Sequence, residues 1–175
     1  MPETKCKLAS NRYGKSRVRL MRLTRHETHH DLDEWTVQVL LTGDFETAHT
    51  VGDNSNILPT DTMKNTVYFV ARESKAESME EYAKELIDFL LKRNSQVSGL
   101  EVSIESHLWK RLTVDGQPHP TAFMHGSEER QTARVSRRQD EAFEIVACHA
   151  RPPATPSPRP VPLLARPGPV PGPCP

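Results

Sequence analysis

Cysteine is scarce in this sequence, and the few cysteines present are far apart. Among 175 residues there are three, Cys6, Cys148 and Cys174, and no two of them have the spacing of a CxxC pair. A disulfide framework needs an even number of cysteines at regular spacings, and many structural zinc sites need paired cysteines. The sequence therefore predicts neither a disulfide-stapled fold nor a cysteine-ligated metal site.

Long apolar runs and an excess of either charge are also missing. No apolar stretch approaches the roughly 20 residues that span a bilayer as a helix, and the first residues lack the apolar segment of a signal peptide. Lysine plus arginine and aspartate plus glutamate each number 23, so the formal net charge is zero. We expect a cytoplasmic protein with no membrane partner and no general affinity for nucleic acid.

Proline is rare until the end of the chain, where it dominates. Of the 15 prolines, 11 lie between Pro152 and Pro175, a density at which neither a helix nor a sheet can complete its hydrogen bonds. We therefore expect three segments: a flexible N-terminus over 1–10, one folded domain over 11–150 and a disordered tail over 151–175. A domain of this length can bury a substantial core.

The periodicity of apolar residues predicts two pairs of strands separated by two helices. Strand-like alternation of apolar and polar residues is found over 15–25, 35–45, 100–114 and, more weakly, 122–135. Helical spacing is found over 60–73 and again over 78–91. Ser78 and Glu81 open the second helix with the pattern of a capping box.

This order of elements predicts an α+β fold. It gives an antiparallel four-stranded sheet with both helices on one face, because helices of this kind must bury their apolar stripe against the sheet. In the first strand Val18 and Leu20 have one parity and Met21 and Leu23 the other, which indicates a β-bulge between Leu20 and Met21, and residues 143–148 are able to begin another strand. Such a sheet has two unpaired edges unless a partner covers them.

A polar turn followed by a helix start, GDNSNILPTDTMKNTVY over 52–68, is the most informative stretch of the chain. Pro59 disfavours helix at the residue before it, and Thr60 and Asp61 are residue types that cap helices. Thr60, Asp61 and Thr62 should therefore occupy the first helical turn, where free backbone N–H groups attract an anion or a carbonyl edge. An ordinary capped helix after a polar turn explains the same residues.

Three separated blocks together resemble one enzyme family. They are Arg12-Tyr13-Gly14-Lys15, the segment around Thr60-Asp61-Thr62, and Asp115-Gly116-Gln117-Pro118-His119-Pro120, and their order is that of the urate oxidases, or uricases. The resemblance covers about Asn11 to Arg137, the N-terminal half of a family member. It implies a single tunnelling-fold (T-fold) unit of the ββααββ kind, whereas family members carry two such units and form homotetramers.

The resemblance also implies an activity and the residues that perform it. Uricases oxidise urate with O2 and water to 5-hydroxyisourate and hydrogen peroxide, and they need neither a metal nor an organic cofactor. Lys15 and Thr60 correspond to the lysine and threonine of the family's proton relay, and the backbone N–H groups of Thr60 and Asp61 correspond to its contacts with the urate ring. A lysine that accepts a proton must be neutral, which burial or the nearby cations Arg12 and Arg17 would favour. Without the family match, Lys15 would be interpreted as a surface lysine at the start of a strand.

The residues of the family's second half have no counterpart in this chain. They include the relay histidine, the phenylalanine that stacks on urate, the arginine that clamps it and the glutamine opposite. We therefore expect little or no activity from the chain alone, and a homo-oligomer or a second chain as its partner. A non-catalytic T-fold module for oligomerisation or binding is the main alternative, and another purine- or pterin-binding T-fold enzyme is the third. Eukaryotic members often end in a peroxisomal signal, whereas this chain ends Pro173-Cys174-Pro175.

A histidine-rich stretch invites a metal interpretation. His26, His29, His30 and Asp31 follow one another closely, but we expect histidines at this spacing to converge only on a helix, and the stretch is predicted to be a hairpin loop. No cysteine accompanies it. The sequence therefore favours a solvated polar loop with no bound metal. His119 is likewise interpreted as a loop or structural residue.

Overall fold

The five strands of the protein form a single antiparallel sheet in which neighbours in sequence are neighbours in space. The computed structural model describes residues 8–150, so most of the predicted N-terminal segment 1–10 and all of the predicted tail 151–175 lie outside the described residues. The strands are β1 (Tyr13–Arg25), β2 (His30–Gly43), β3 (Val97–Val114), β4 (Gln117–Arg138) and β5 (Glu144–Ala150), in the order β1-β2-β3-β4-β5. The first four match the predicted strands in order, and β5 occupies the stretch that was able to begin another strand.

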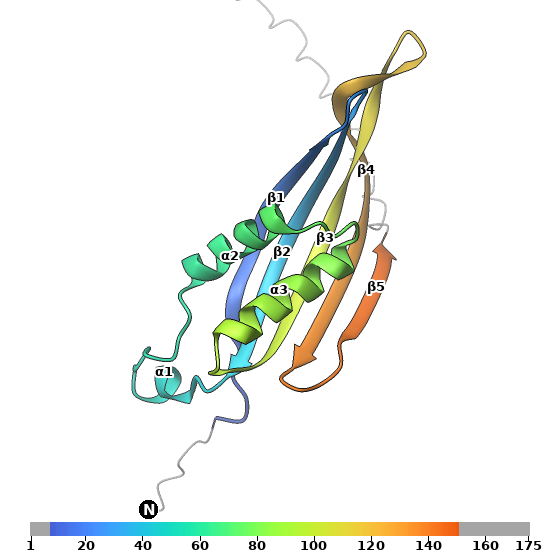
Figure 1. The fold of residues 1–175 in the computed structure, drawn as a ribbon. Helices are drawn as coiled ribbons and strands as arrows, with labels where there is room; N and C mark the ends of the chain where they lie inside the picture. The colour runs from blue at the N-terminus through green and yellow to red at the C-terminus, as the bar shows by residue number, and fades with distance from the viewer. Residues whose placement is uncertain (1–7, 151–175) are drawn as a thin grey trace, which may run out of the picture.

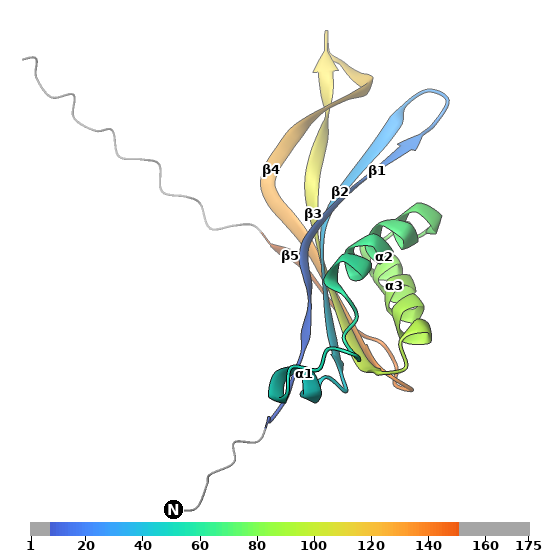
Figure 2. The ribbon, with the colours of Figure 1, turned by 90° about the vertical axis from the view of Figure 1, so that its left-hand side faces the viewer.

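Two long helices cover one face of this sheet, as Figure 2 shows. They are α2 (Thr60–Glu73) and α3 (Met79–Arg93). The α3 start is the predicted one, because the Ser78 hydroxyl accepts a hydrogen bond from the Glu81 N–H at 3.2 Å. A short helix, α1 (Glu46–Thr50), was not predicted. It buries no residue, so its sequence has no apolar periodicity that would indicate a helix. No helix of residues 8–150 has the length and apolar character needed to cross a membrane.

The core fills the layer between the helices and the sheet. Met63, Val67, Leu86 and Ile87 from the helices are completely buried, and they face residues of the sheet that are equally inaccessible. The sheet contributes Val37, Val39, Leu41, Val102, Ile104 and Val135 to this core. Burying each such side chain stabilises the fold by about 1.5–3 kcal/mol. The apolar residues that alternate along the strands are the ones that face this layer, which explains the pattern seen in the sequence.

Both long hairpins continue beyond the helices. Figure 1 shows the β1–β2 and β3–β4 hairpins extending past the ends of α2 and α3. The β3–β4 turn is made by Asp115 and Gly116, whose φ angles of 50° and 77° are the positive values that a tight two-residue hairpin turn requires. Apolar side chains on the β3–β4 extension, including Leu112 and Met124, are exposed. These parts of the sheet therefore depend on pairing and polar contacts rather than on burial.

Candidate functional site

A β-bulge in β1 sets the direction of Lys15. Lys15 pairs with Val39 and Val18 pairs with Val37, so Ser16 and Arg17 together oppose the single residue Gln38. Directly paired residues of an antiparallel sheet point to the same face, and Val39 is part of the core. The Lys15 side chain therefore lies on the helix-covered side of the sheet. Arg17 accommodates the bulge with a φ of 55°, a left-handed conformation that is uncommon for arginine.

Gly14 allows the two strands to approach closely beside this bulge. A Cβ atom built on Gly14 would lie 1.9 Å from the Val39 carbonyl oxygen, a distance that no real side chain tolerates. The glycine of the first sequence block is therefore required for the pairing that positions Lys15.

The start of α2 presents backbone donors to solvent. Pro59 is the N-cap and has no N–H, and the first helical bond runs from the Met63 N–H to the Pro59 carbonyl at 3.1 Å. The N–H groups of Thr60, Asp61 and Thr62 consequently have no partner within the helix. Thr60 is the first helical residue, as expected, but the structure corrects its capping role, because no side chain caps α2.

Tyr13 joins the two parts of the site. Its hydroxyl accepts a hydrogen bond from the Leu58 N–H at 2.7 Å and donates to the Leu58 carbonyl at 3.3 Å. Its ring packs edge-on against Phe45, with ring centroids 4.7 Å apart. The residue two positions before Lys15 is thus bound to the residue two positions before Thr60. The first sequence block contained Tyr13, but nothing in the sequence showed that its hydroxyl makes this connection.

The charges at the site are arranged around Asp61. Lys64 donates a hydrogen bond to the Asp61 carboxylate at 3.0 Å and lowers the pKa of that group below its ordinary value, and the charge of Lys15 acts in the same direction more weakly. Asp61 is therefore an anion held by the next helical turn, which is the arrangement of a structural acceptor rather than of a base. The same effect shows that the Lys15 ammonium lies within electrostatic range of the α2 start.

Lys15 and Thr60 are brought to the same part of the surface without being bonded to each other. Within residues 8–150, no hydrogen bond joins their side chains; Lys15 is half-buried and Thr60 is exposed. A lysine beside unpaired N–H donors can hold a planar anion and exchange protons with it.

His119 has the structural role expected of it, although it lies in β4 rather than in a loop. Its Nδ1 accepts hydrogen bonds from the Thr121 and Ala122 N–H groups at 3.2 and 3.0 Å. The ring therefore stabilises the local backbone of the third sequence block.

A buried carboxylate on the opposite face of the sheet was not foreseen. Glu34 is only 3% exposed, accepts a hydrogen bond from Arg19 Nε at 3.0 Å and accepts another from Trp109 Nε1 at 2.9 Å. The Arg19 guanidinium lowers the pKa of Glu34 below its ordinary value, with a smaller contribution from Trp109, and together they outweigh the opposite effect of burial. Glu34 alternates with core residues of β2, so its sequence position predicted an exposed side chain. It anchors three strands and does not touch the Lys15–Thr60 surface.

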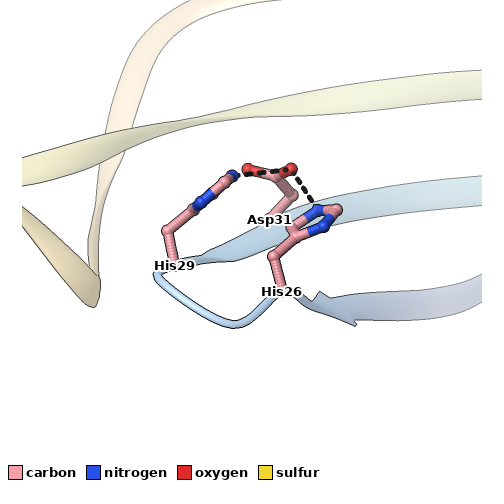
Figure 3. Close-up of side chains that lie close together, drawn as sticks. All are labelled: His26, His29 and Asp31. Carbon is pink, nitrogen blue, oxygen red and sulfur yellow. Dashed lines mark hydrogen bonds and ion pairs between the residues drawn. The ribbon is translucent and has the colours of Figure 1, made fainter.

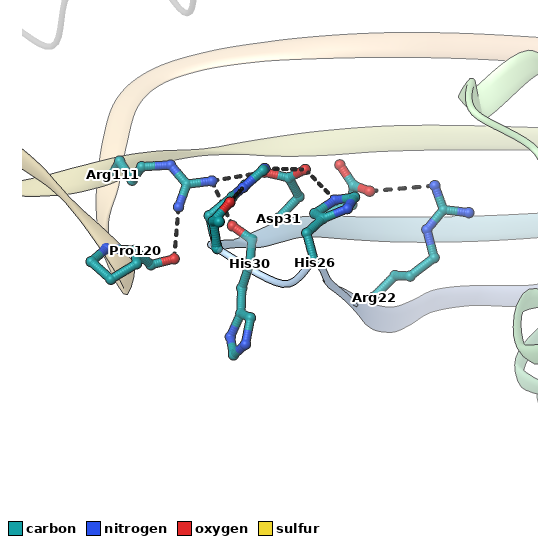
Figure 4. Close-up of polar contacts among 9 residues, drawn as sticks. Arg22, His26, His30, Asp31, Arg111 and Pro120 are labelled. Atoms are coloured by element: carbon teal, nitrogen blue, oxygen red, sulfur yellow. Dashed lines mark hydrogen bonds and ion pairs between the residues drawn. The ribbon is translucent and has the colours of Figure 1, made fainter.

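The histidine-rich hairpin contradicts the expectation that its side chains diverge. His26 Nε2 lies 2.9 Å and His29 Nε2 lies 3.7 Å from the Asp31 Oδ2 atom, and the two rings stack with centroids 4.5 Å apart (Figure 3). A helix is not needed, because His26 and His29 face each other across the turn and Asp31 follows His29 by two residues, which places all three on one face. His30 points away, as Figure 4 shows.

The topology and the placement of Lys15 beside the α2 start define the class of protein. A sequentially ordered antiparallel sheet with two helices inserted after β2, both on one face, is an α+β unit of the T-fold kind. Two of the three sequence blocks that carry the family resemblance, those of Lys15 and Thr60, lie together in that unit.

The chain belongs to the uricase family. The family model described as "Uricase" matches residues 11–136. The uricase of Cyberlindnera jadinii is 36% identical over 138 residues, which are 77% of this chain and 46% of that protein. Uricase-2 isozyme 1 of Glycine max is 41% identical over 126 residues, covering 71% of this chain and 41% of its own length.

A solved structure supports the same assignment. The crystal structure of uricase from Arthrobacter globiformis superposes with a TM-score of 0.74 at 36% identity and covers 82% of this chain and 48% of that one. The chain therefore spans about half the length of the relatives it matches. β5 begins after the residues matched by the family model, and it completes the sheet at the edge next to β4.

Proposed function

We propose that the chain supplies the urate-binding and proton-relay wall of a urate oxidase. In this role the N–H groups of Thr60 and Asp61 donate to the ring edge of the urate anion. Lys15, when neutral, takes a proton from the Thr60 hydroxyl or from a bound water. The overall reaction is urate plus O2 plus H2O giving 5-hydroxyisourate plus H2O2, with the substrate supplying the electrons.

The Tyr13–Leu58 connection is the observation that supports this proposal most directly. It holds two sequence blocks 45 residues apart so that the Lys15 ammonium acts electrostatically on the first turn of α2. An ordinary capped helix has no need of a lysine from a distant strand. The chain spans about half the length of the uricases it matches, so we propose that turnover requires residues from a further chain, either another copy or a chain that carries the second T-fold unit.

Ligand binding tests the wall independently of turnover. Urate or an azapurine analogue should raise the Tm of the purified chain, and Lys15→Met and Thr60→Ala should each remove most of that increase. Lys75→Met and Thr62→Ala are matched controls, because Lys75 is an exposed lysine beyond α2 and Thr62 lies in the same helical turn as Thr60. An unchanged increase in the Lys15 and Thr60 variants would show that urate binds elsewhere.

Turnover tests the missing half. The chain alone should neither consume urate nor release peroxide at a rate above background. Addition of a second-half fragment of a related uricase should produce activity that depends on Lys15. Peroxide production by the chain alone would contradict the incomplete-site proposal.

A non-catalytic assembly module is the second candidate, and the open sheet supports it. β1 and β5 are edge strands, and Ile145 and Val146 of β5 are exposed at 44% and 51%. Unpaired edges with apolar residues favour pairing with another chain. Self-association by size-exclusion chromatography with no Tm response to urate would favour this module over the enzyme.

A further inference from the structure

The tip of the β1–β2 hairpin carries a cluster that the proposed urate chemistry does not use. Eleven residue steps separate Lys15 from His26 along β1, which corresponds to roughly 35 Å of strand. The cluster and the Lys15–Thr60 surface are therefore at opposite ends of the same strand, and no group of one can reach the other.

We propose that His26, His29 and Asp31 bind a divalent transition-metal cation of the zinc, cobalt, nickel or copper type. One ligand atom from each of the three residues lies within 4.8 Å of the others. Tetrahedral bonds of about 2.0–2.1 Å place neighbouring ligand atoms about 3.3 Å apart. The His26–Asp31 and His29–Asp31 distances of 2.9 and 3.7 Å lie on either side of that value, so small rotations of the side chains are enough to form three bonds.

The surroundings hold the carboxylate in an orientation suited to this role. Arg111 donates to Asp31 Oδ1 at 2.7 Å and to the His30 carbonyl at 2.5 Å, and it also donates to the Pro120 carbonyl at 2.9 Å (Figure 4). Oδ2 is thereby left facing the two imidazoles. Ligating carboxylates are commonly fixed by such a partner on their other oxygen.

The histidines are oriented in a similar way. His29 Nδ1 is 3.1 Å from the Thr28 hydroxyl, so its Nε2 is directed toward Asp31. The backbone N–H of His26 donates to the backbone carbonyl of His29 at 2.9 Å. This bond closes the turn and keeps the two rings side by side. The backbone pairing therefore brings the two histidines together before any cation is present.

The donor set and its exposure determine which cation fits. Two imidazoles and one carboxylate favour zinc and its neighbours over magnesium or calcium, which require several oxygen ligands. The three side chains are 44–52% exposed, so the cation is accessible to solvent and water can take a fourth position. The positive charge of Arg111 opposes the cation while its hydrogen bond fixes Asp31, which places the site among those of moderate affinity.

Cobalt and zinc titrations test the site. The full chain, without a polyhistidine tag, is titrated with Co2+ followed by visible absorption, and with Zn2+ in competition with a chromophoric chelator. The unaltered chain should bind one equivalent of each cation. Co2+ should show the absorption of a low-coordinate site without the charge-transfer band of a thiolate ligand, which separates this site from the three cysteines of the chain.

Matched variants locate the binding. The double variant His26→Gln/His29→Gln should bind at least ~100-fold more weakly and Asp31→Asn at least ~10-fold more weakly, since even partners of ligands change affinity by about 10–100-fold. His30→Gln is the control, because its ring comes from the same hairpin and points away. The Tm of each variant in the absence of metal establishes that it is folded. If either the double histidine variant or Asp31→Asn fails to fold, the other still tests the site.

Several outcomes would overturn the proposal. One is that the unaltered chain binds the cation no more tightly than the double variant does, and another is that His30→Gln loses as much affinity as the double variant. A third is a thiolate charge-transfer band in the Co2+ spectrum. Excess Mg2+ that displaces the Co2+ would also contradict it. None of these measurements involves urate, so their failure is separate from failure of the proposed enzyme function.

Discussion

The helix-covered part of the sheet and the hairpin tips are stabilised by different interactions. Under α2 and α3, residues such as Leu86 and Val102 are completely buried. At the tips, beyond the helices, Leu112 is exposed, and Arg111 connects Asp31, His30 and Pro120 instead. Apolar burial thus holds one region, while charge-assisted hydrogen bonds between strands hold the other.

The two regions differ in how freely they can carry polar functional residues. A packed core allows few substitutions, because a change of one methylene is felt by its neighbours. The tips are free of that constraint, and the polar cluster of His26, His29 and Asp31 lies there. The Lys15–Thr60 surface lies at the boundary of the packed region, where the core fixes the backbone and the side chains remain accessible.

Truncation of a leucine in each region gives the largest contrast. Leu86→Ala should lower the free energy of unfolding by about 2–5 kcal/mol, because it leaves a cavity in the core. The same change at Leu112 should lower it by less than about 1 kcal/mol. Urea denaturation followed by circular dichroism measures both, and equal losses would mean that the tips are as tightly packed as the core.

Removal of the buried charge at Glu34 should have an intermediate effect that depends on pH. Glu34→Gln should lower the free energy of unfolding at neutral pH by about 1 kcal/mol, a value reduced because Arg19 is largely exposed. The pKa of Glu34 is lowered in the folded state, so its stabilisation is complete above the ordinary value of 4.5 and is lost as the pH falls through the lower folded-state value.

Denaturation at neutral pH and well below pH 4.5 therefore gives the test of Glu34. The difference between the unaltered chain and the variant should disappear in acid. Glu105→Gln is the control, because Glu105 and its partner Arg130 are both exposed. A larger loss of unfolding free energy in Glu105→Gln than in Glu34→Gln would contradict the stabilising role of the buried carboxylate.

The smallest global effect is expected at the tip. Arg111→Met keeps the apolar stem of the side chain and removes three hydrogen bonds, and it should change the free energy of unfolding by no more than about 1 kcal/mol. Its local effect should be larger: amide hydrogen exchange should accelerate around residues 26–31 and remain unchanged in α3. Faster exchange throughout the sheet would show that Arg111 supports the whole fold.

Much of the fold followed from periodicity alone. The α2 and α3 starts and the four long strands were all predicted, because each has a local signal in apolar spacing or capping residues. The bulge of β1 was predicted at the wrong place: it lies at Ser16 and Arg17, and Met21 and Leu23 break the alternation only because they are exposed on the other face of a regularly paired strand. β5 was noted only as a stretch able to form a strand, since a strand in which Ile145 and Val146 are both exposed has weak alternation. α1 had no signal because it buries nothing.

The candidate site was predictable only in part. Family blocks identified Lys15, Thr60 and Asp61, and the structure places them on one surface, but their catalytic and binding roles stay predictions. The Tyr13–Leu58 bond depends on a contact between distant segments, which no periodicity reports. The convergence of His26, His29 and Asp31 was missed because it depends on the register of a hairpin, and a two-residue turn between His26 and His29 was the signal that would have revealed it.

The extra residue in β1 gives that strand an unusual tolerance. Tyr13 and Lys15 follow one alternation and Val18 and Leu20 follow the other, yet all four face the helices because the strand resets its phase between them. Exchanging the side chain of Ser16 leaves this arrangement intact, although Gly14 beside it has no room for a Cβ atom. Shortening the strand there by one residue would turn either the lysine or the core valine to the wrong side, so evolution can vary the composition of this segment far more readily than its length.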